Sequence, residues 1–183
     1  RFEIEERINF KGEIIKNLDE LGLIKIARKI ANSGVNTLAI VFMHSFKNSS
    51  HEKLAKKIIE AHVPNINICL SSIVSPEIGE YERTSTTVAN AYVQPIFKSY
   101  VSSLVQGLKK IGIINDLFLM LSDGGIVHEK TAIEFPIRLV QSGPAGGAQA
   151  ATLYGKLLKQ DNILCFDMGG TTAKACLIEN GKP

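Results

Sequence analysis

The chain has little of what several classes of protein require. Its 183 residues include three cysteines, and none of them lies in a Cys-x-x-Cys pair or in a Cys/His spacing that binds metal. No apolar run approaches the ~18 residues of a membrane-spanning helix. The formal net charge is only +3, and Lys and Glu are mixed along the predicted helices, unlike the basic stripe of a nucleic-acid-binding protein. These absences argue against a membrane span, a nucleic-acid partner and a metal or redox role for the cysteines.

The cysteines and the first residues indicate a compartment. Cys69, Cys165 and Cys176 each lie in an apolar segment, so we expect buried thiols in a reducing environment. Arg1–Arg7 is charged throughout and does not resemble a secretory signal. With 45% hydrophobic residues the chain has ample material for a core. We therefore expect a cytoplasmic location.

The most informative segment is an apolar strand that runs into a glycine turn. From Ile163 it reads ILCFDMGGTT, and the apolar segment Ala173–Ile178 follows. Glycines let the backbone approach an anion and point N–H groups at it, and threonine hydroxyls add donors. A single acid before the turn can hold a divalent metal directly or through water. The pattern predicts a phosphate site. Its expected members are Gly169, Gly170, Thr171 and Thr172, with Asp167 as the catalytic residue and Mg²⁺ ligand.

Two alternatives to this site remain open. The glycines can simply turn a hairpin that Asp167 caps. Strand alternation places Lys174 on one face with Cys176 and Ile178. If that face looks toward the phosphates, the Lys174 ammonium neutralises them as a point charge; otherwise Lys174 is a solvated surface residue.

A small-residue helix is predicted before this hairpin, from Ser142 to about Lys159. Pro144 suits its first turn. The exposed N–H groups around Ser142 and Gly143 can receive a phosphate or a substrate carboxylate. Tight packing of the helix is an equally good explanation of its small residues.

Two further polar segments are candidates for a substrate site or domain cleft. Glu82 and Arg83 lie in a dense polar run, and an Arg beside acids and hydroxyls can clamp a small polar ring and its carboxylate. The alternative is a helix start capped by Thr84 or Ser85. Asp123 and Gly124 follow a predicted strand, where α/β sheets often bind ligands.

The histidines favour structural roles. In Ser49-Ser50-His51-Glu52, Ser49 is expected as an N-cap with Glu52 reaching back in a capping box. His44 is expected to be hydrogen-bonded at a strand end, since two histidines without a third ligand do not form a zinc site. His62 and His128 are expected at the surface.

Long motifs in this chain are similar to the hydantoinase A, 5-oxoprolinase and acetone carboxylase family, within the actin-like ATPase superfamily. They include VSPEIGEYERTSTTVANAYVQP from Val74, FMHSF from Phe42, SDGG from Ser122 and SGPAG from Ser142. The resemblance covers about residues 13–182. Two departures are Asp123, where relatives carry Asn, and Lys174, where many carry an acid.

The resemblance implies a layered α/β, ribonuclease H-like architecture that binds ATP and Mg²⁺. It implies ATP-dependent opening of a cyclic amide, such as 5-oxoproline or a hydantoin, by phosphoryl activation of its carbonyl. Relatives carboxylate ketones instead, and a hydantoinase B-type partner subunit or domain commonly completes the reaction. A non-catalytic actin-like nucleotide-binding module is the other reading.

The resemblance also implies a central fragment of a longer subunit, because the family carries a first Asp-x-Gly-Gly-Thr hairpin that has no copy here. We expect part of the first α/β domain in residues 1–141, a connecting helix in 142–160, and the hairpin that opens the second domain in 161–183. A nucleotide site made of two facing hairpins would then be incomplete.

The apolar patterns predict alternating strands and helices. A hairpin is expected from residues 2–8 and 13–15. Helices are expected at 18–32, 50–61 and 84–111, the last kinked or restarted at Pro95. The remaining strands are expected at 35–43, 66–70, 117–121, 163–168 and 173–178.

Overall fold

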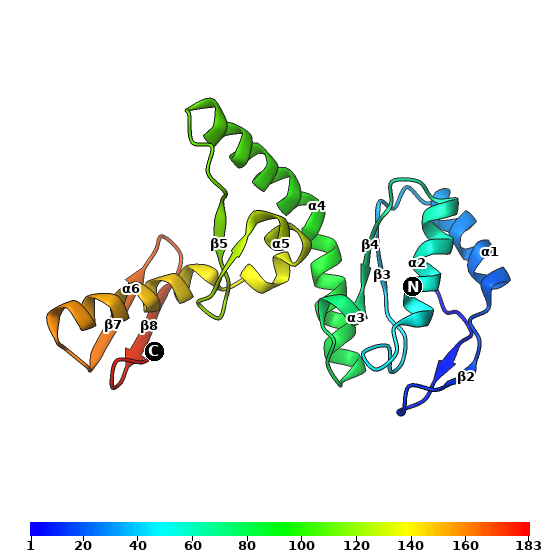
Figure 1. The fold of residues 1–183 in the computed structure, drawn as a ribbon, viewed down its shortest axis with the longest axis horizontal. Coiled ribbons are helices and arrows are strands. Elements are labelled where there is room, and N and C mark those ends of the chain that lie inside the picture. Colours follow the sequence, from blue (N-terminus) through cyan, green and yellow to red (C-terminus); the bar gives the residue numbers. More distant parts are fainter. The chain divides into compact units, whose positions relative to one another are not determined.

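The computed structural model describes Arg1–Pro183, which form two compact units, Arg1–Ser99 and Tyr100–Pro183. Both units mix helices with short strands, and every sheet has two strands (Figure 1). The mixed helix and strand composition confirms the coarse part of the predicted fold class. The division falls inside one long helix, and the predicted boundaries at 141/142 and 160/161 stay predictions. No helix combines the length and apolarity that crossing a bilayer demands.

The first unit opens with the predicted hairpin and continues with alternating helices and strands. In the hairpin, Gly12 N donates to Asn9 O at 2.9 Å to close the turn. The elements are β1 (Arg7–Ile8), β2 (Ile14–Lys16), α1 (Glu20–Ala31), β3 (Thr37–Ile40), α2 (Ser50–His62) and β4 (Asn67–Leu70). Each confirms a predicted element, although β1 and β3 are shorter than the apolar runs suggested.

Strand β3 pairs in parallel with β4, with Thr37 opposite Asn67 and Ile40 opposite Leu70. A parallel pair needs a crossover, which α2 provides. Helix α1 begins at Glu20 because the Asp19 carboxylate accepts a hydrogen bond from Gly22 N at 2.9 Å. The apolar faces of both helices and both strands form the core. Its buried members are Leu18, Leu23, Ala27, Ile30, Ile40, Ala55, Ile59, Val63, Ile66 and Leu70.

After β4 come the short helix α3 (Ser71–Val74), which was not predicted, and α4 (Glu80–Lys110). Helix α4 starts four residues before the predicted Thr84 and runs through Pro95. The predicted cap at Thr84 is wrong, since its hydroxyl donates to Glu80 O inside the helix. The start is set by Gly79, whose φ of +108° ends the preceding loop.

In the second unit, the end of α4 is followed by an antiparallel pair, β5 (Phe118–Met120) and β6 (Ile126–His128), joined by the Ser122–Gly125 turn. The sequence predicted β5 and the turn but neither β6 nor the short helices that follow. The remaining elements are α5 (Glu129–Glu134), the 3₁₀ helix η1 (Pro136–Leu139), α6 (Ser142–Leu158), β7 (Ile163–Met168) and β8 (Ala173–Ile178).

Helix α6 and the β7–β8 hairpin match the prediction closely. The hairpin is antiparallel, and its inner face lies on α6, where Ile178 is fully buried. The Ile163 side chain and the Gln160 carbonyl lie so close to Gly155 that no side chain fits at that position. Cys165 and Cys176, opposite each other on this face, are half-buried rather than buried as predicted, whereas Cys69 is buried. The reason is that one helix covers only part of a hairpin's face.

Candidate functional site

The β7–β8 turn is a short, fully exposed loop. Gly169 N donates to Thr172 O at 3.0 Å, which closes the turn with the backbone alone. A side chain added at Gly170 would meet nothing within 4 Å. The backbone of the turn therefore lies open to a ligand, and the hydroxyls of Thr171 and Thr172 are exposed beside it.

Asp167 and Lys174 lie opposite each other across the two strands, next to this turn. They share their face of the hairpin with Cys165 and Ile178, so it is the face that turns toward α6. Both side chains are exposed. An acid, a cation, two hydroxyls and an open glycine turn are a set of groups suited to a phosphate with its magnesium ion.

The turn lies toward the N-terminal end of α6. Strand β7 runs antiparallel to α6, since Ile163 contacts Gly155 while Cys165 Sγ lies 3.9 Å from Gly147 O. Strand β7 therefore continues, through Asp167, toward the end of the helix that holds Ser142 and Gly143. No side chain caps the N-terminus of α6. The predicted anion-binding helix start and the predicted phosphate turn therefore lie at the same end of this unit.

The Ser122–Gly125 turn also lies against α6. Gly124 has a φ of +83°, and a Cβ there would lie 2.6 Å from Gln149 Nε2. Asp123 is exposed and accepts a hydrogen bond from Gly125 N at 2.8 Å. The positive φ favours glycine at position 124, and a larger residue there would also have to displace the flexible Gln149 side chain.

The Ser122 hydroxyl joins this turn to the start of α6. It donates to Arg138 O at 2.7 Å and accepts from Gln141 N at 3.1 Å. The structure thus brings Asp123 and Gly124 close to the residue before Ser142. Three of the four predicted site segments thus lie along α6 in the second unit, and the fourth, Glu82–Arg83, belongs to the first unit.

In the first unit, helix α4 places the two predicted residues Glu82 and Arg83 in different surroundings. Glu82 is exposed, whereas Arg83 is fully buried. Arg83 Nη2 donates to Phe42 O at 2.7 Å, and the guanidinium lies 5.4 Å from the centre of the Phe46 ring. Arg83 thus holds the FMHSF segment after β3. Its contact with a substrate stays a prediction.

The predicted capping box is wrong, because Glu52 turns inward. Ser49 makes no side-chain capping bond. Glu52 is fully buried and accepts hydrogen bonds from Phe42 N, the Ser71 hydroxyl and Ser72 N. One carboxylate therefore ties together the segments that follow β3 and β4.

Sequence reasoning missed the roles of Glu52 and Ser71. A signal was present, because Glu52, Ala55 and Ile59 recur at the spacing of the buried face of α2. An acid on an apolar helix face indicates a buried hydrogen-bonded role. The Ser45 hydroxyl extends the network by its 3.0 Å contact with Ser71.

The histidines differ from expectation in two cases. His44 adopts a φ of +56°, and its Nδ1 is buried without a hydrogen-bond partner, so the predicted bond at the strand end is not made there. His128 is half-buried, with Nδ1 2.9 Å from the Glu129 carboxylate. His51 Nδ1 lies 2.8 Å from Glu6 Oε2, a buried contact that fastens the first strand to α2. His62 is exposed, as expected.

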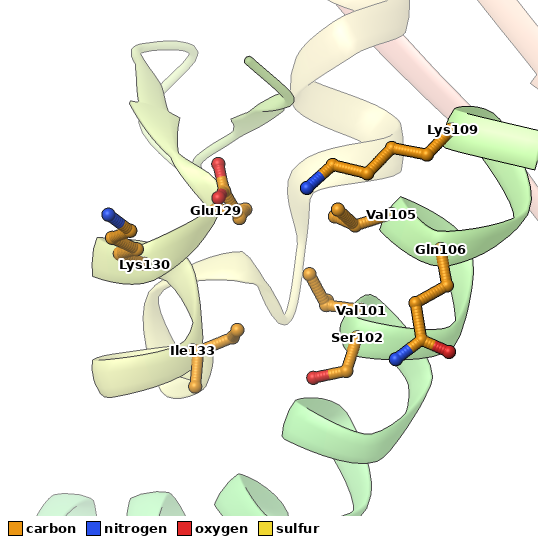
Figure 2. A pocket seen from close by; sticks show the side chains of 8 residues that line it. All are labelled: Val101, Ser102, Val105, Gln106, Lys109, Glu129, Lys130 and Ile133. Atoms are coloured by element: carbon orange, nitrogen blue, oxygen red, sulfur yellow. The ribbon is translucent and has the colours of Figure 1, made fainter. Parts of the chain in front are cut away.

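A separate groove of about 270 Å³ lies between α4 and α5 (Figure 2). Val101, Val105 and Ile133 form its apolar wall. Lys109 reaches from α4 toward Glu129 on α5 (Figure 2). None of the residues predicted for the functional site lines this groove.

Comparisons with known proteins identify the family. A sequence model described as hydantoinase/oxoprolinase matches residues 83–183, and one described as the hydantoinase/oxoprolinase N-terminal region matches residues 1–63. An uncharacterized protein of Methanocaldococcus jannaschii is 44% identical over the whole chain, which covers 27% of that protein. The chain thus spans about a quarter of the length of this relative, and 13% of the 5-oxoprolinase of Saccharomyces cerevisiae, to which it is 34% identical.

Two solved structures resemble the chain over nearly all of its length. The nucleotide-free structure of acetone carboxylase, whose carboxylation of acetone is ATP-dependent, is 29% identical with a TM-score of 0.87, covering 98% of this chain and 26% of the other. The ATP-dependent caprolactamase of Pseudomonas jessenii is 30% identical with a TM-score of 0.84, covering 95% and 25%. With the family models matching both ends of the sequence, the chain belongs to the hydantoinase/oxoprolinase family.

Proposed function

We propose that this chain is part of an ATP-dependent enzyme that opens a cyclic amide, and that the β7–β8 turn binds the phosphates of ATP. One observation carries the proposal. The exposed Gly169–Thr172 turn has Asp167 and Lys174 opposite each other beside it, and β7 leads to it along α6 in the direction of the uncapped helix start.

Each residue of the turn has a role in this proposal. The Gly170 N–H group and the hydroxyls of Thr171 and Thr172 donate to phosphate oxygens. Gly169, whose own N–H closes the turn, lets the backbone come close to the phosphate. Asp167 holds Mg²⁺, which supplies charge neutralisation and orientation when bound. Lys174 adds a positive charge on the same face.

Residues near α6 are proposed to complete the site. The N–H groups at Ser142 and Gly143 favour an anion because they begin a 17-residue helix. Asp123 and Gly124 lie beside that helix start and are proposed to border the substrate. Glu82 and Arg83 belong to the first unit, and for them we propose a place at a domain cleft.

The substrate class follows from the relatives. Caprolactamase and 5-oxoprolinases act on cyclic amides by name, and an amide carbonyl resists water because nitrogen donates electron density to it. Transfer of the γ-phosphoryl group of ATP to the carbonyl oxygen releases ADP and makes the carbon electrophilic. Water then adds to this carbon and the C–N bond breaks, with nitrogen leaving as the amine. A second water releases phosphate from the resulting acyl phosphate. The protein contributes position and electrostatic stabilisation.

The architecture remains part of the proposal. We propose an actin-like, ribonuclease H-like ATPase in which residues 1–141 belong to a first domain, 142–160 connect, and 161–183 open a second. A hydantoinase B-type partner is proposed because one relative is a caprolactamase alpha subunit and another is a gamma subunit of acetophenone carboxylase.

Ketone carboxylation is the second candidate, because acetone carboxylase is one of the two similar structures and an acetophenone carboxylase subunit is 29% identical to this chain. The test measures ATP hydrolysis by the longest natural polypeptide that carries this sequence, together with its partner subunit. 5-Oxoproline, hydantoin and caprolactam are compared with acetone and acetophenone, each with and without bicarbonate. Stimulation by a cyclic amide without bicarbonate supports ring opening. Stimulation only by a ketone with bicarbonate supports carboxylation, and nucleotide binding without stimulation supports a non-catalytic module.

A further inference from the structure

Helix α4 is polar on its inner face and apolar on its outer face in the first unit. The buried side carries Arg83, Thr87 and Asn90. Thr87 donates to Arg83 O at 2.7 Å, and Asn90 Nδ2 lies 3.5 Å from Cys69 Sγ on β4. A surface helix normally has the reverse arrangement, with its apolar side inward.

The outer face carries a row of large apolar side chains. Tyr81 is 80% exposed, Val88 52%, Tyr92 76% and Ile96 69%. Steps of seven, four and four residues place these side chains on one side of a helix. We call this set the α4 stripe.

The stripe lacks the charges that accompany solvent-facing helices. No Asp, Glu, Lys or Arg occurs from Thr84 to Phe97. Depletion of charge together with exposed tyrosine and aliphatic residues is typical of the centre of a protein interface. Permanent interfaces are more apolar than transient ones. The stripe therefore has the chemistry of a permanent contact.

We propose that the α4 stripe packs permanently against polypeptide of the same protein that lies outside residues 1–183. The two solved relatives support this choice of occupant. The matched region makes up only 26% and 25% of their chains, so most of each polypeptide is available to cover such a face. Apolar rows at helical spacing fit the ridges of another helix or the flat face of a sheet.

Photo-crosslinking in the full-length natural polypeptide tests the proposal. Tyr81 and Tyr92 are replaced, one at a time, by p-benzoylphenylalanine, which preserves their aromatic character. Lys57, exposed on α2 among charged neighbours, carries the same group as the control. We expect intrachain crosslinks from both stripe positions to peptides outside residues 1–183, at least tenfold more abundant than from position 57.

Other outcomes overturn the proposal. A crosslink to a partner subunit or to a second copy would make the stripe an intersubunit surface. A crosslink to residues 100–183 would show that the chain covers the stripe itself, and a yield equal to that of position 57 would leave it solvated. Tyr92→Lys supplies an independent measurement, since a buried charge lowers the melting temperature of the full-length protein by several degrees while Lys57→Ala leaves it unchanged. Equal melting temperatures for the two variants would also contradict the proposal.

Discussion

Asp167 and Lys174 are directly opposed across the β7–β8 hairpin, separated from its turn by a single residue pair. The turn itself is closed by a backbone hydrogen bond between Gly169 and Thr172. The acid is therefore not required to close the hairpin. Substitutions of Asp167 and Lys174 can therefore test ligand binding without opening the turn.

Asp167→Asn is expected to lower ATP turnover by the full-length enzyme on the order of a hundredfold or more, because it removes the charge that recruits metal while keeping the side-chain shape. Because Asp167 is exposed, the melting temperature should be unchanged. Steady-state ATP hydrolysis at saturating Mg²⁺ measures the effect. Turnover equal to that of the unaltered enzyme would leave Asp167 as a surface residue of the hairpin.

Lys174→Met is expected to weaken ATP binding with little change in folding stability, because the variant keeps the stem and deletes the charge. Lys156→Met, on the exposed side of α6 in the same unit, is the matched control. Nucleotide titration of both full-length variants gives the comparison. If the two have the same affinity, Lys174 is a solvated lysine that takes no part in phosphate binding.

The 183-residue chain by itself is expected to hydrolyse no ATP. The family resemblance implies that the β7–β8 hairpin faces another Asp-x-Gly-Gly-Thr hairpin across the nucleotide, and this sequence has no copy of that other hairpin. Phosphate release by the purified chain, with Mg²⁺ and ATP, is compared with that of a heat-denatured sample. Magnesium-dependent turnover above that control would mean that one hairpin is enough.

The helix–hairpin segment was predictable because its signals are local. An apolar run with period two, a Gly-Gly pair and a second apolar run define β7, the turn and β8, and Pro144 defines the first turn of α6. Strand alternation placed Lys174, Cys176 and Ile178 on one face of β8. The structure agrees, because Ile178 is the buried residue of β8 and Cys176 is half-buried.

The polar core of the first unit was not predictable in the same way. Glu52 and Ser71 are 19 residues apart, and only the parallel pairing of β3 with β4 brings their segments together. The local pattern Ser-Ser-His-Glu predicted that Glu52 would cap α2. In the structure the Glu52 carboxylate is instead buried, where it accepts hydrogen bonds from three donors. The short elements α3, α5 and η1 have too few residues to show a period.

Gly155→Ala is expected to destabilise the second unit by about 1–3 kcal/mol, because its Cβ would lie 2.4 Å from Ile163 Cδ1 and 2.8 Å from Gln160 O. Gly147→Ala, in the same helix, meets nothing within 4 Å and should stabilise by roughly 0.5–1 kcal/mol. Urea unfolding of the two variants measures the difference. A loss of stability at both positions would indicate that the β7–β8 hairpin packs on α6 in another way.

Glu52→Ala is expected to lower the free energy of unfolding by about 3 kcal/mol, since it leaves Phe42 N, Ser71 and Ser72 N without their acceptor inside the protein. Glu60→Ala on the same helix removes an exposed acid, 3.7 Å from Lys56, and should change stability by less than about 0.5 kcal/mol. Glu52→Gln should fall between them, because an amide oxygen still accepts while its NH₂ group faces further donors. Chemical denaturation of the three variants gives the order directly. If Glu52→Ala were as mild as Glu60→Ala, the carboxylate would not be what joins the segments after β3 and β4, and the contacts of Arg83 and Ser71 with the FMHSF segment would suffice.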